Sequence, residues 1–244
     1  MCGGSGETAT IHGTSITITS WNVRSLKPEK LKLPGVEGLL EASDILLLQE
    51  TWLDSGDNVP EAISELYTCF VSCRKRTSTR GRPSGGTAIC IKKHLNCTLH
   101  KVDHELGTIW VQIHDVMDKK LFIGTCYFSP VGSHIWTGIN RNPFEALEED
   151  IVSLSKIGDI IIGGDFNART GTSKEIIPLD ISDRDSFTSH TNMHESLVWL
   201  RDIIPQHQLP VRKNTDDTEP NNYGQQLLQI CGNTGTCILN GRRG

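Results

Sequence analysis

The chain has 244 residues, a formal net charge of −5 and a pI near 6.0. That length suits one domain with a substantial core. The mild acidity excludes binding of nucleic acid through a large overall positive charge, but it is compatible with a nuclease whose basic residues are local. No apolar run reaches the length of a membrane span, and the first residues lack a secretory signal. We therefore expect an intracellular protein, nuclear or cytoplasmic, with no membrane partner.

The predicted strands extend from residue 16 to residue 162, and one interrupted helix lies between the first two of them. Residues 1–14 are expected to form a flexible lead-in, and residues 15–244 the domain. A helix is expected over 27–42, interrupted at Pro34 because proline clashes with the preceding turn. Strands are expected in six segments that are short, rich in β-branched residues and bounded by Gly, Pro or Asp: 16–21, 45–49, 87–91, 109–113, 121–127 and 160–162.

The second half adds the remaining helices. Pro143 opens one of them at the favoured first position. A second is expected over 222–232, and a short third one over 193–203 within a polar surface excursion. Hairpin-linked strands with helices between them suggest a mixed α/β sandwich, in which two sheets lie face to face with helices outside.

One strand of this set ends in a group of polar residues. The apolar run 160–162 stops at Gly163 and Gly164 and is followed by Asp165, Phe166 and Asn167. In a strand, residues two apart point to the same side, so Asp165 and Asn167 converge if the strand continues through them. The alternative is a simple turn, because Gly, Asp and Asn are turn residues.

Two other strands end in the same way. The segment 45–49 leads into Gln49 and Glu50, and the segment 16–21 leads into Trp21 and Asn22. Ligand sites in α/β sheets gather beyond the carboxyl ends of strands, so these residues predict a metal-assisted site with oxygen ligands. Considered one at a time, the two residues have simpler explanations: Glu50 is a solvated acid at the end of a strand, and Asn22 is a helix N-cap.

Taken in order, these blocks resemble the endonuclease/exonuclease/phosphatase superfamily. The similarity extends from about residue 16 to the end of the chain, and within the superfamily the stretch 164–171 is most similar to the endonuclease domains of non-LTR retrotransposons. The blocks that carry it are Trp21-Asn22, Gln49-Glu50-Thr51-Trp52, Tyr127-Phe128-Ser129-Pro130 and Gly164-Asp165-Phe166-Asn167.

The resemblance implies a four-layer α/β sandwich of two mixed sheets and a DNA endonuclease that uses Mg²⁺, with Mn²⁺ as the alternative. Glu50 is the implied first metal ligand, assisted by the side-chain oxygen of Asn22. Asp165 would orient or deprotonate the attacking water, Asn167 would donate to a phosphate oxygen, and Tyr127 would contact the phosphate or the leaving group. No protein partner is implied. A phosphomonoester or a phospholipid headgroup is the alternative substrate within the same fold.

The chain departs from the family at its end. The family closes with a Ser-Asp-His block, and no Ser-Asp-His occurs in these 244 residues. We therefore expect a domain that is incomplete at its C-terminus, truncated before its final strands, and impaired in activity. A non-catalytic remnant that binds DNA weakly is the alternative.

A basic segment is the remaining candidate for substrate binding. Residues 74–82 contain no acid and include Arg74, Lys75, Arg76 and Arg80. The segment is explained equally well as a loop that grips phosphate or as a solvated turn. The eight cysteines lack Cys-x-x-Cys spacing, and a zinc site is not expected.

Overall fold

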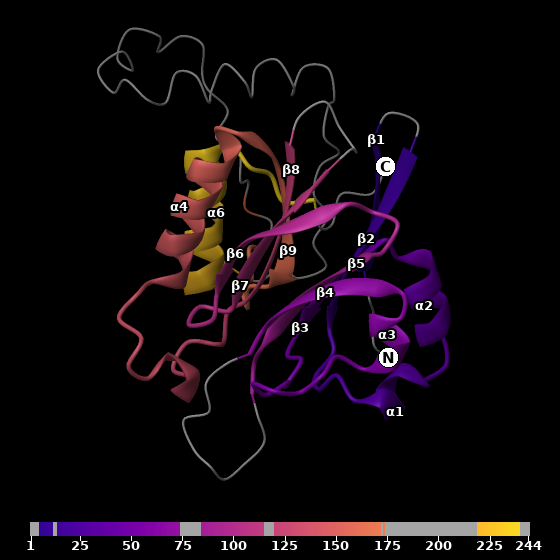
Figure 1. Ribbon diagram of the computed structural model, residues 1–244. Helices are drawn as coiled ribbons and strands as arrows, with labels where there is room; N and C mark the ends of the chain where they lie inside the picture. The colour runs from indigo at the N-terminus through magenta and orange to yellow at the C-terminus, as the bar shows by residue number, and fades with distance from the viewer. Residues whose placement is uncertain are drawn as a thin grey trace, which may run out of the picture. The chain divides into compact units, whose positions relative to one another are not determined.

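The computed structural model describes residues 5–11, 14–73, 84–114, 120–171, 173 and 219–239, with side chains from Ile16 onward. The chain divides into two compact units, Met1–Pro143 with Ser153–Phe166, and Phe144–Val152 with Asn167–Gly244. The first unit contains both sheets, which Figure 1 shows as two sets of labelled strands.

The first sheet has five strands in the order β1-β2-β3-β5-β4. Its central strand β3 pairs in parallel with β2 and antiparallel with β5, so the sheet is mixed. All five residues of β3 are buried, which explains its continuous apolar run. The strands are β1 (Ser5–Ile11), β2 (Thr14–Asn22), β3 (Ile45–Gln49), β4 (Tyr67–Ser72) and β5 (Thr87–Lys92).

The second sheet has four strands in the order β6-β7-β8-β9. Its first three strands pair antiparallel, and β9 pairs in parallel with β8. The two mixed sheets confirm the predicted fold class. The strands are β6 (Cys97–Asp103), β7 (Thr108–Ile113), β8 (Lys120–Tyr127) and β9 (Gly158–Asp165).

The two sheets share one buried aliphatic cluster. It contains Ile45 and Leu47 of β3 together with Val111 of β7 and Ile123 of β8, each at most 1% exposed. Because alternate residues of a strand point to opposite faces, these side chains define the faces that the two sheets turn toward each other. Burial of this apolar surface stabilises the sandwich.

Three short helices cover the other face of the first sheet, as Figure 1 shows beside β3 and β4. They contribute Leu31, Leu40 and Ile63 to a second cluster with Leu48 and Cys90 of the sheet. Gly35 between the first two helices has φ 85°, a conformation that favours glycine. The helices are α1 (Pro28–Leu31), α2 (Val36–Ala42) and α3 (Glu61–Ser64).

The described part of the second unit is built around two helices, α4 (Pro143–Ser155) and α6 (Asn222–Thr234). They lie side by side in Figure 1, with the rings of Phe144 and Tyr223 4.9 Å apart between centroids. The side chain of Asn221 caps α6 by accepting a hydrogen bond from the amide of Gly224 at 2.7 Å.

Several elements differ from the predictions. Residues Ser5–Ile11, which lie in the segment expected to be a flexible lead-in, form β1 and pair antiparallel with β2. The helix α3 and the strands β4 and β6 were also not predicted. Both strands contain exposed or half-buried residues and lack a continuous apolar run. The helix expected over 193–203 lies outside the described residues. No described helix is both long and apolar enough to cross a membrane.

Candidate active site

The polar residues at the strand ends come from both sheets. In the first sheet, Asn22 is the register partner of Gln49, and Glu50 follows directly. In the second sheet, Tyr127 is the register partner of Asp165 at the end of the parallel pair β8 and β9. Parallel pairing places the carboxyl ends of each pair at the same edge of its sheet. All these residues belong to the first compact unit.

Asn22 connects the two strand ends. Its amide nitrogen donates to Oε1 of Glu50 at 2.8 Å and to Oδ2 of Asp165 at 2.8 Å. Its oxygen accepts from the backbone N–H of Arg24 at 3.3 Å. The neutral amide group of Asn22 therefore lies between the carboxylates of Glu50 and Asp165 and donates to both.

The backbone around Glu50 is held in uncommon conformations. Glu50 and Trp52 have φ 53° and 55°, and Arg24 and Ser25 in the neighbouring loop have φ 43° and 88°. Such left-handed residues cost of order 1–3 kcal/mol each and cluster at functional sites. The two loops are joined by a hydrogen bond from the amide of Ser25 to the carbonyl of Glu50 at 2.7 Å. In addition, Lys30 donates to the carbonyls of Val23 and Arg24.

Tyr127 keeps its proton at neutral pH. Burial raises the pKa of Tyr127 from its ordinary value of 10.0 to about 12, and the negative charge of Glu50, to which the phenol is hydrogen bonded, adds to the shift. The phenol is therefore a hydrogen-bond donor at the site. The segment after it is held by Trp136, whose indole N–H donates to the carbonyl of Ser129 at 2.8 Å.

The two glycines before Asp165 have a packing reason. A Cβ on Gly164 would lie 2.3 Å from the backbone oxygen of Cys126, and one on Gly163 would lie 2.6 Å from a methyl group of Leu47. Glycine at these positions lets β9 approach both its neighbour β8 and the core between the sheets. The amide of Phe128 then donates to the carbonyl of Asp165 at 2.9 Å and fixes the strand end.

Gln49 supports the strand ends in a way that its place in the sequence did not indicate. Its side chain is buried and donates to the carbonyl of Leu47 at 2.8 Å and to Oγ1 of Thr125 at 3.2 Å. Because Thr125 belongs to the second sheet, this hydrogen bond joins the two sheets directly behind the strand ends. The signal was a lone amide at the end of an otherwise apolar strand.

Asp165 and Asn167 were expected to converge if the strand continued through both residues, and this condition is not met. The strand β9 ends at Asp165, and Asn167 has φ 49°, so the alternation of a strand does not extend to it. Asn167 belongs to the second compact unit, where its carbonyl accepts a hydrogen bond from the side chain of Asn221 at 3.0 Å. Its role at a phosphate stays a prediction.

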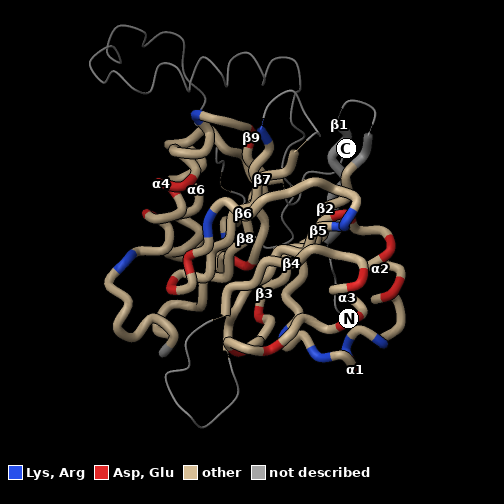
Figure 2. Tube along the Cα trace, viewed as in Figure 1, with Lys and Arg blue, Asp and Glu red and all other residues tan. Residues whose placement is uncertain are grey.

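The predicted substrate-binding residues Arg74, Lys75, Arg76 and Arg80 lie outside the described residues. In the described part, Figure 2 shows several Lys and Arg positions close together around α1 and others interspersed with Asp and Glu.

The carboxylates suit a hard divalent cation. Mg²⁺ is bound through one or two carboxylates and keeps waters or substrate oxygens as its other ligands, and Glu50 and Asp165 supply two carboxylates on either side of an amide. Among the described residues, no group of three or more His, Cys, Asp or Glu side chains is placed to hold a metal. Glu50 and Asp165 offer carboxylate oxygen atoms, which are the ligand type that Mg²⁺ and Mn²⁺ prefer over the nitrogen and sulfur atoms of His and Cys.

Several solved structures are similar to this chain at low sequence identity. The 3′ phosphatase NExo from Neisseria, solved with a product DNA hairpin, is 22% identical with a TM-score of 0.45, and the match covers 65% of this chain and 59% of that one. The endonuclease domain of TRAS1, a telomere-specific non-LTR retrotransposon, is 18% identical with a TM-score of 0.48, and the match covers 93% and 75%. An AP endonuclease from Archaeoglobus fulgidus is 18% identical with a TM-score of 0.43, covering 66% and 60%.

The chain thus spans about three fifths of the length of the Neisseria and Archaeoglobus enzymes. Comparison with curated protein sequences gives no significant match. The model of the endonuclease/exonuclease/phosphatase family, in contrast, matches residues 19–225. This match includes all the strand ends described above, and the chain belongs to the endonuclease/exonuclease/phosphatase family.

Proposed function

We propose that this chain is a DNA endonuclease domain of the retrotransposon type that hydrolyses phosphodiester bonds with Mg²⁺. The observation that carries the proposal is the pair of 2.8 Å hydrogen bonds by which Asn22 connects Glu50 and Asp165. Family membership supports the reaction class. The stretch from Gly164 to Gly171 supports the retrotransposon type by its resemblance, and Mn²⁺ is the alternative cation.

Each residue has a role in this proposal. Glu50 would hold the cation, which when bound neutralises charge on the phosphate. Asp165 would accept a hydrogen bond from the attacking water and orient it. Tyr127, whose phenol is protonated at neutral pH, would donate to a phosphate or leaving-group oxygen. Asn167 would donate its amide to a phosphate oxygen.

Asn22 has a more specific requirement. It presents its nitrogen to Glu50 and Asp165 and its oxygen to Arg24. For its oxygen to face a cation beside Glu50, the amide must turn about its last side-chain bond and lose these hydrogen bonds. We therefore assign Asn22 a supporting role and Glu50 the main one.

Turnover by these 244 residues is expected to be slow. The sequence contains no Ser-Asp-His block, and loss of a single preorganised donor typically costs about 10²–10³ in rate. Relaxation of supercoiled plasmid detects such slow hydrolysis because one break in either strand converts the whole molecule.

The test compares plasmid nicking by the wild-type chain, Glu50→Ala and Asp165→Ala, each with Mg²⁺ and with a chelator. We expect slow nicking by the wild type that requires Mg²⁺ and falls at least about 10²-fold in both variants. Glu149→Ala on α4 serves as the matched control, because it removes an exposed carboxylate from a helix that carries none of the proposed site residues, and it should nick like the wild type.

Three results would contradict the proposal. Nicking that persists in both variants would indicate a contaminant or another site. Absence of nicking together with hydrolysis of an inositol phosphate would favour a phosphatase of the same fold. Stabilisation by Mg²⁺ without turnover on either substrate would instead favour a non-catalytic remnant.

A further inference from the structure

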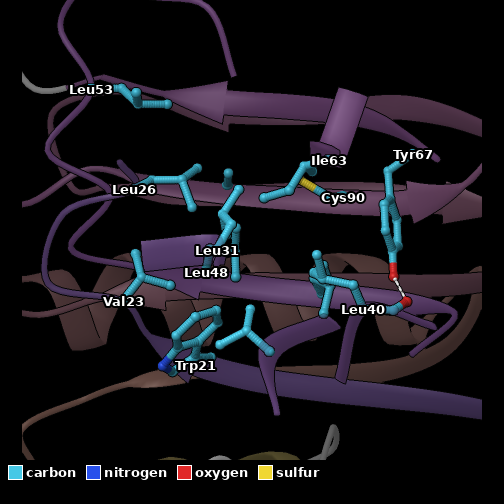
Figure 3. Packing of buried hydrophobic residues seen from close by; sticks show 13 residues of the cluster. Trp21, Val23, Leu26, Leu31, Leu40, Leu48, Leu53, Ile63, Tyr67 and Cys90 are labelled. Carbon is cyan, nitrogen blue, oxygen red and sulfur yellow. Dashed lines mark hydrogen bonds between the residues drawn. The ribbon is translucent and has the colours of Figure 1, made fainter. Parts of the chain in front are cut away.

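Two thiols face each other across neighbouring strands of the first sheet. Cys69 of β4 is the direct partner of Cys90 of β5 in the antiparallel register. Both side chains point to the face covered by α1, α2 and α3, where Cys90 belongs to the buried cluster and Cys69 packs against it. Figure 3 shows the sulfur of Cys90 beside Ile63 in this cluster.

The register brings the two thiols within reach of a bond. Directly opposed residues of an antiparallel pair have Cα atoms about 4.5 or 5.5 Å apart. Both distances fall inside the range of about 4.4–6.8 Å that disulfides span. The two side chains are also hydrogen bonded to each other through their sulfur atoms. The bridge therefore requires rotation of side chains and little movement of the backbone.

The two thiols differ in access. The strand β4 is the last strand of its sheet, and Cys69 is half-buried. Cys90 lies on the inner neighbour β5 and is fully buried. A small oxidant can therefore meet Cys69 first, with Cys90 already in place to resolve the product.

We propose that Cys69 and Cys90 are a redox modification site, which forms a reversible cross-strand disulfide by exchange with a small-molecule disulfide. The Cys69 thiolate attacks one sulfur of the oxidant, whose S–S bond breaks and releases one thiolate. Cys90 then attacks the Cys69 sulfur of the mixed disulfide and releases the second thiolate. The two protein thiols are oxidised, the small disulfide is reduced to two thiols, and these take up both protons.

The surroundings of Cys90 set the rate of the second step. Its hydrogen bond to Cys69 and its burial raise the pKa of the Cys90 thiol well above the usual value. Since the thiolate is the nucleophile, resolution should be slow at neutral pH and faster as pH rises. Contact between the two sulfurs favours resolution over a second attack by the small disulfide.

The bridge would tie an edge strand to the strand that begins beside the candidate site. The residues that precede β5 accept hydrogen bonds from the loop after Glu50, at 3.2 Å from the amide of Thr51 to Gly86 and at 3.0 Å from Trp52 to Gly85. A closed loop between Cys69 and Cys90 lowers the entropy of the unfolded chain. The oxidised protein should therefore melt at a higher temperature than the reduced one.

The experiment incubates the whole 244-residue chain with glutathione disulfide, alkylates the remaining thiols and maps the peptides by mass spectrometry. A combined digest with trypsin and chymotrypsin separates Cys69 from Cys73, because Phe70 lies between them. We expect residues 68–70 linked to residues 81–92, with the link lost after reduction. Cys69→Ser should abolish the link, and Cys73→Ser, the matched control, should retain it.

The proposal is overturned if Cys69 and Cys90 both remain alkylatable at every ratio of glutathione disulfide to glutathione, while circular dichroism shows a folded chain. It is equally overturned if Cys69 is linked to Cys73 or to another cysteine. The Cys90→Ala variant keeps the test valid if Cys69→Ser folds poorly. None of these results depends on nuclease activity, so the outcome is separate from that of the proposed function.

Discussion

The space between the two sheets and the loops at the strand ends follow opposite rules. The buried cluster between the sheets contains ten side chains, all Ile, Leu or Val. In the described segments, the five residues other than glycine with positive φ all follow strands: Arg24, Ser25, Glu50, Trp52 and Asn167. Regular apolar packing thus stabilises the strands, and the strain is concentrated where they end.

This difference teaches that stability and function depend on separate residues here. A change in the cluster should lower the free energy of unfolding and leave the chemistry of the remaining folded molecules intact. A change at the strand ends should impair the chemistry without lowering the free energy of unfolding, because strained active-site residues are held at a cost to stability.

The largest expected effect is on stability, from Leu47→Ala in the cluster between the sheets. Leu47 is 1% exposed, and loss of a buried leucine side chain costs about 2–5 kcal/mol. Urea denaturation measures the free energy of unfolding. Plasmid nicking per folded molecule should stay within a few-fold of the wild type. A chain that keeps its stability but loses nicking would break the comparison.

The next largest expected effect, from Gly164→Ala, is on both stability and nicking. In Gly164→Ala the new methyl group would lie 2.3 Å from the backbone oxygen of Cys126, so β9 must move away from β8. We expect a loss of about 1–3 kcal/mol from overpacking, together with loss of nicking because Asp165 follows directly. Gly132→Ala offers a control for the removal of a glycine with open space around it, although its φ of 79° adds backbone strain.

A smaller effect tests the strain itself. Arg24 is exposed and has φ 43°, a conformation that costs a side chain about 1–2 kcal/mol and glycine almost nothing. After the greater flexibility of glycine in the unfolded chain is subtracted, Arg24→Gly should stabilise the protein by about 0.5–1 kcal/mol. The melting temperatures of Arg24→Gly and of the control variant Arg24→Ala, compared with that of the wild type, measure this stabilisation. A Gly variant less stable than the Ala variant would contradict the strain.

The smallest effect at neutral pH concerns Tyr127. Its pKa is raised in the folded chain from 10.0 to about 12, so the stabilisation it provides is complete below pH 10 and is lost as pH rises through 12. The difference in melting temperature between the wild type and Tyr127→Phe, measured at several pH values, should be constant up to pH 10 and shrink above it. A difference that grows above pH 10 would show the opposite sign.

The sequence predicted the strands that are rich in β-branched residues and bounded by Gly, Pro or Asp, and it missed β4 and β6. The run from Ile45 to Gln49 is buried at every position, and its bounds were predicted without error. β4 and β6 mix exposed and half-buried residues, and their pairing with inner strands stabilises them in a way that no local pattern records.

Asn22, Glu50, Tyr127 and Asp165 stay predictions as site residues. Each lies at or directly after the end of a strand, and the hydrogen bonds of Asn22 bring Glu50 and Asp165 together. The left-handed conformation of Asn167 and the inter-sheet hydrogen bond of Gln49 depend on tertiary packing. Neither has a signature within a few neighbouring residues.

The central claim is that the ends of β2, β3 and β9 form one site for a divalent cation. Paramagnetic Mn²⁺ tests it directly, because it broadens the NMR signals of nearby nuclei in the ¹⁵N-labelled chain. We predict that one equivalent of Mn²⁺ broadens the side-chain amide of Asn22, identified with Asn22→Ser, and that Glu50→Gln prevents the broadening. An Asn22 signal that stays sharp in the wild type, or that broadens equally in Glu50→Gln, would contradict the account.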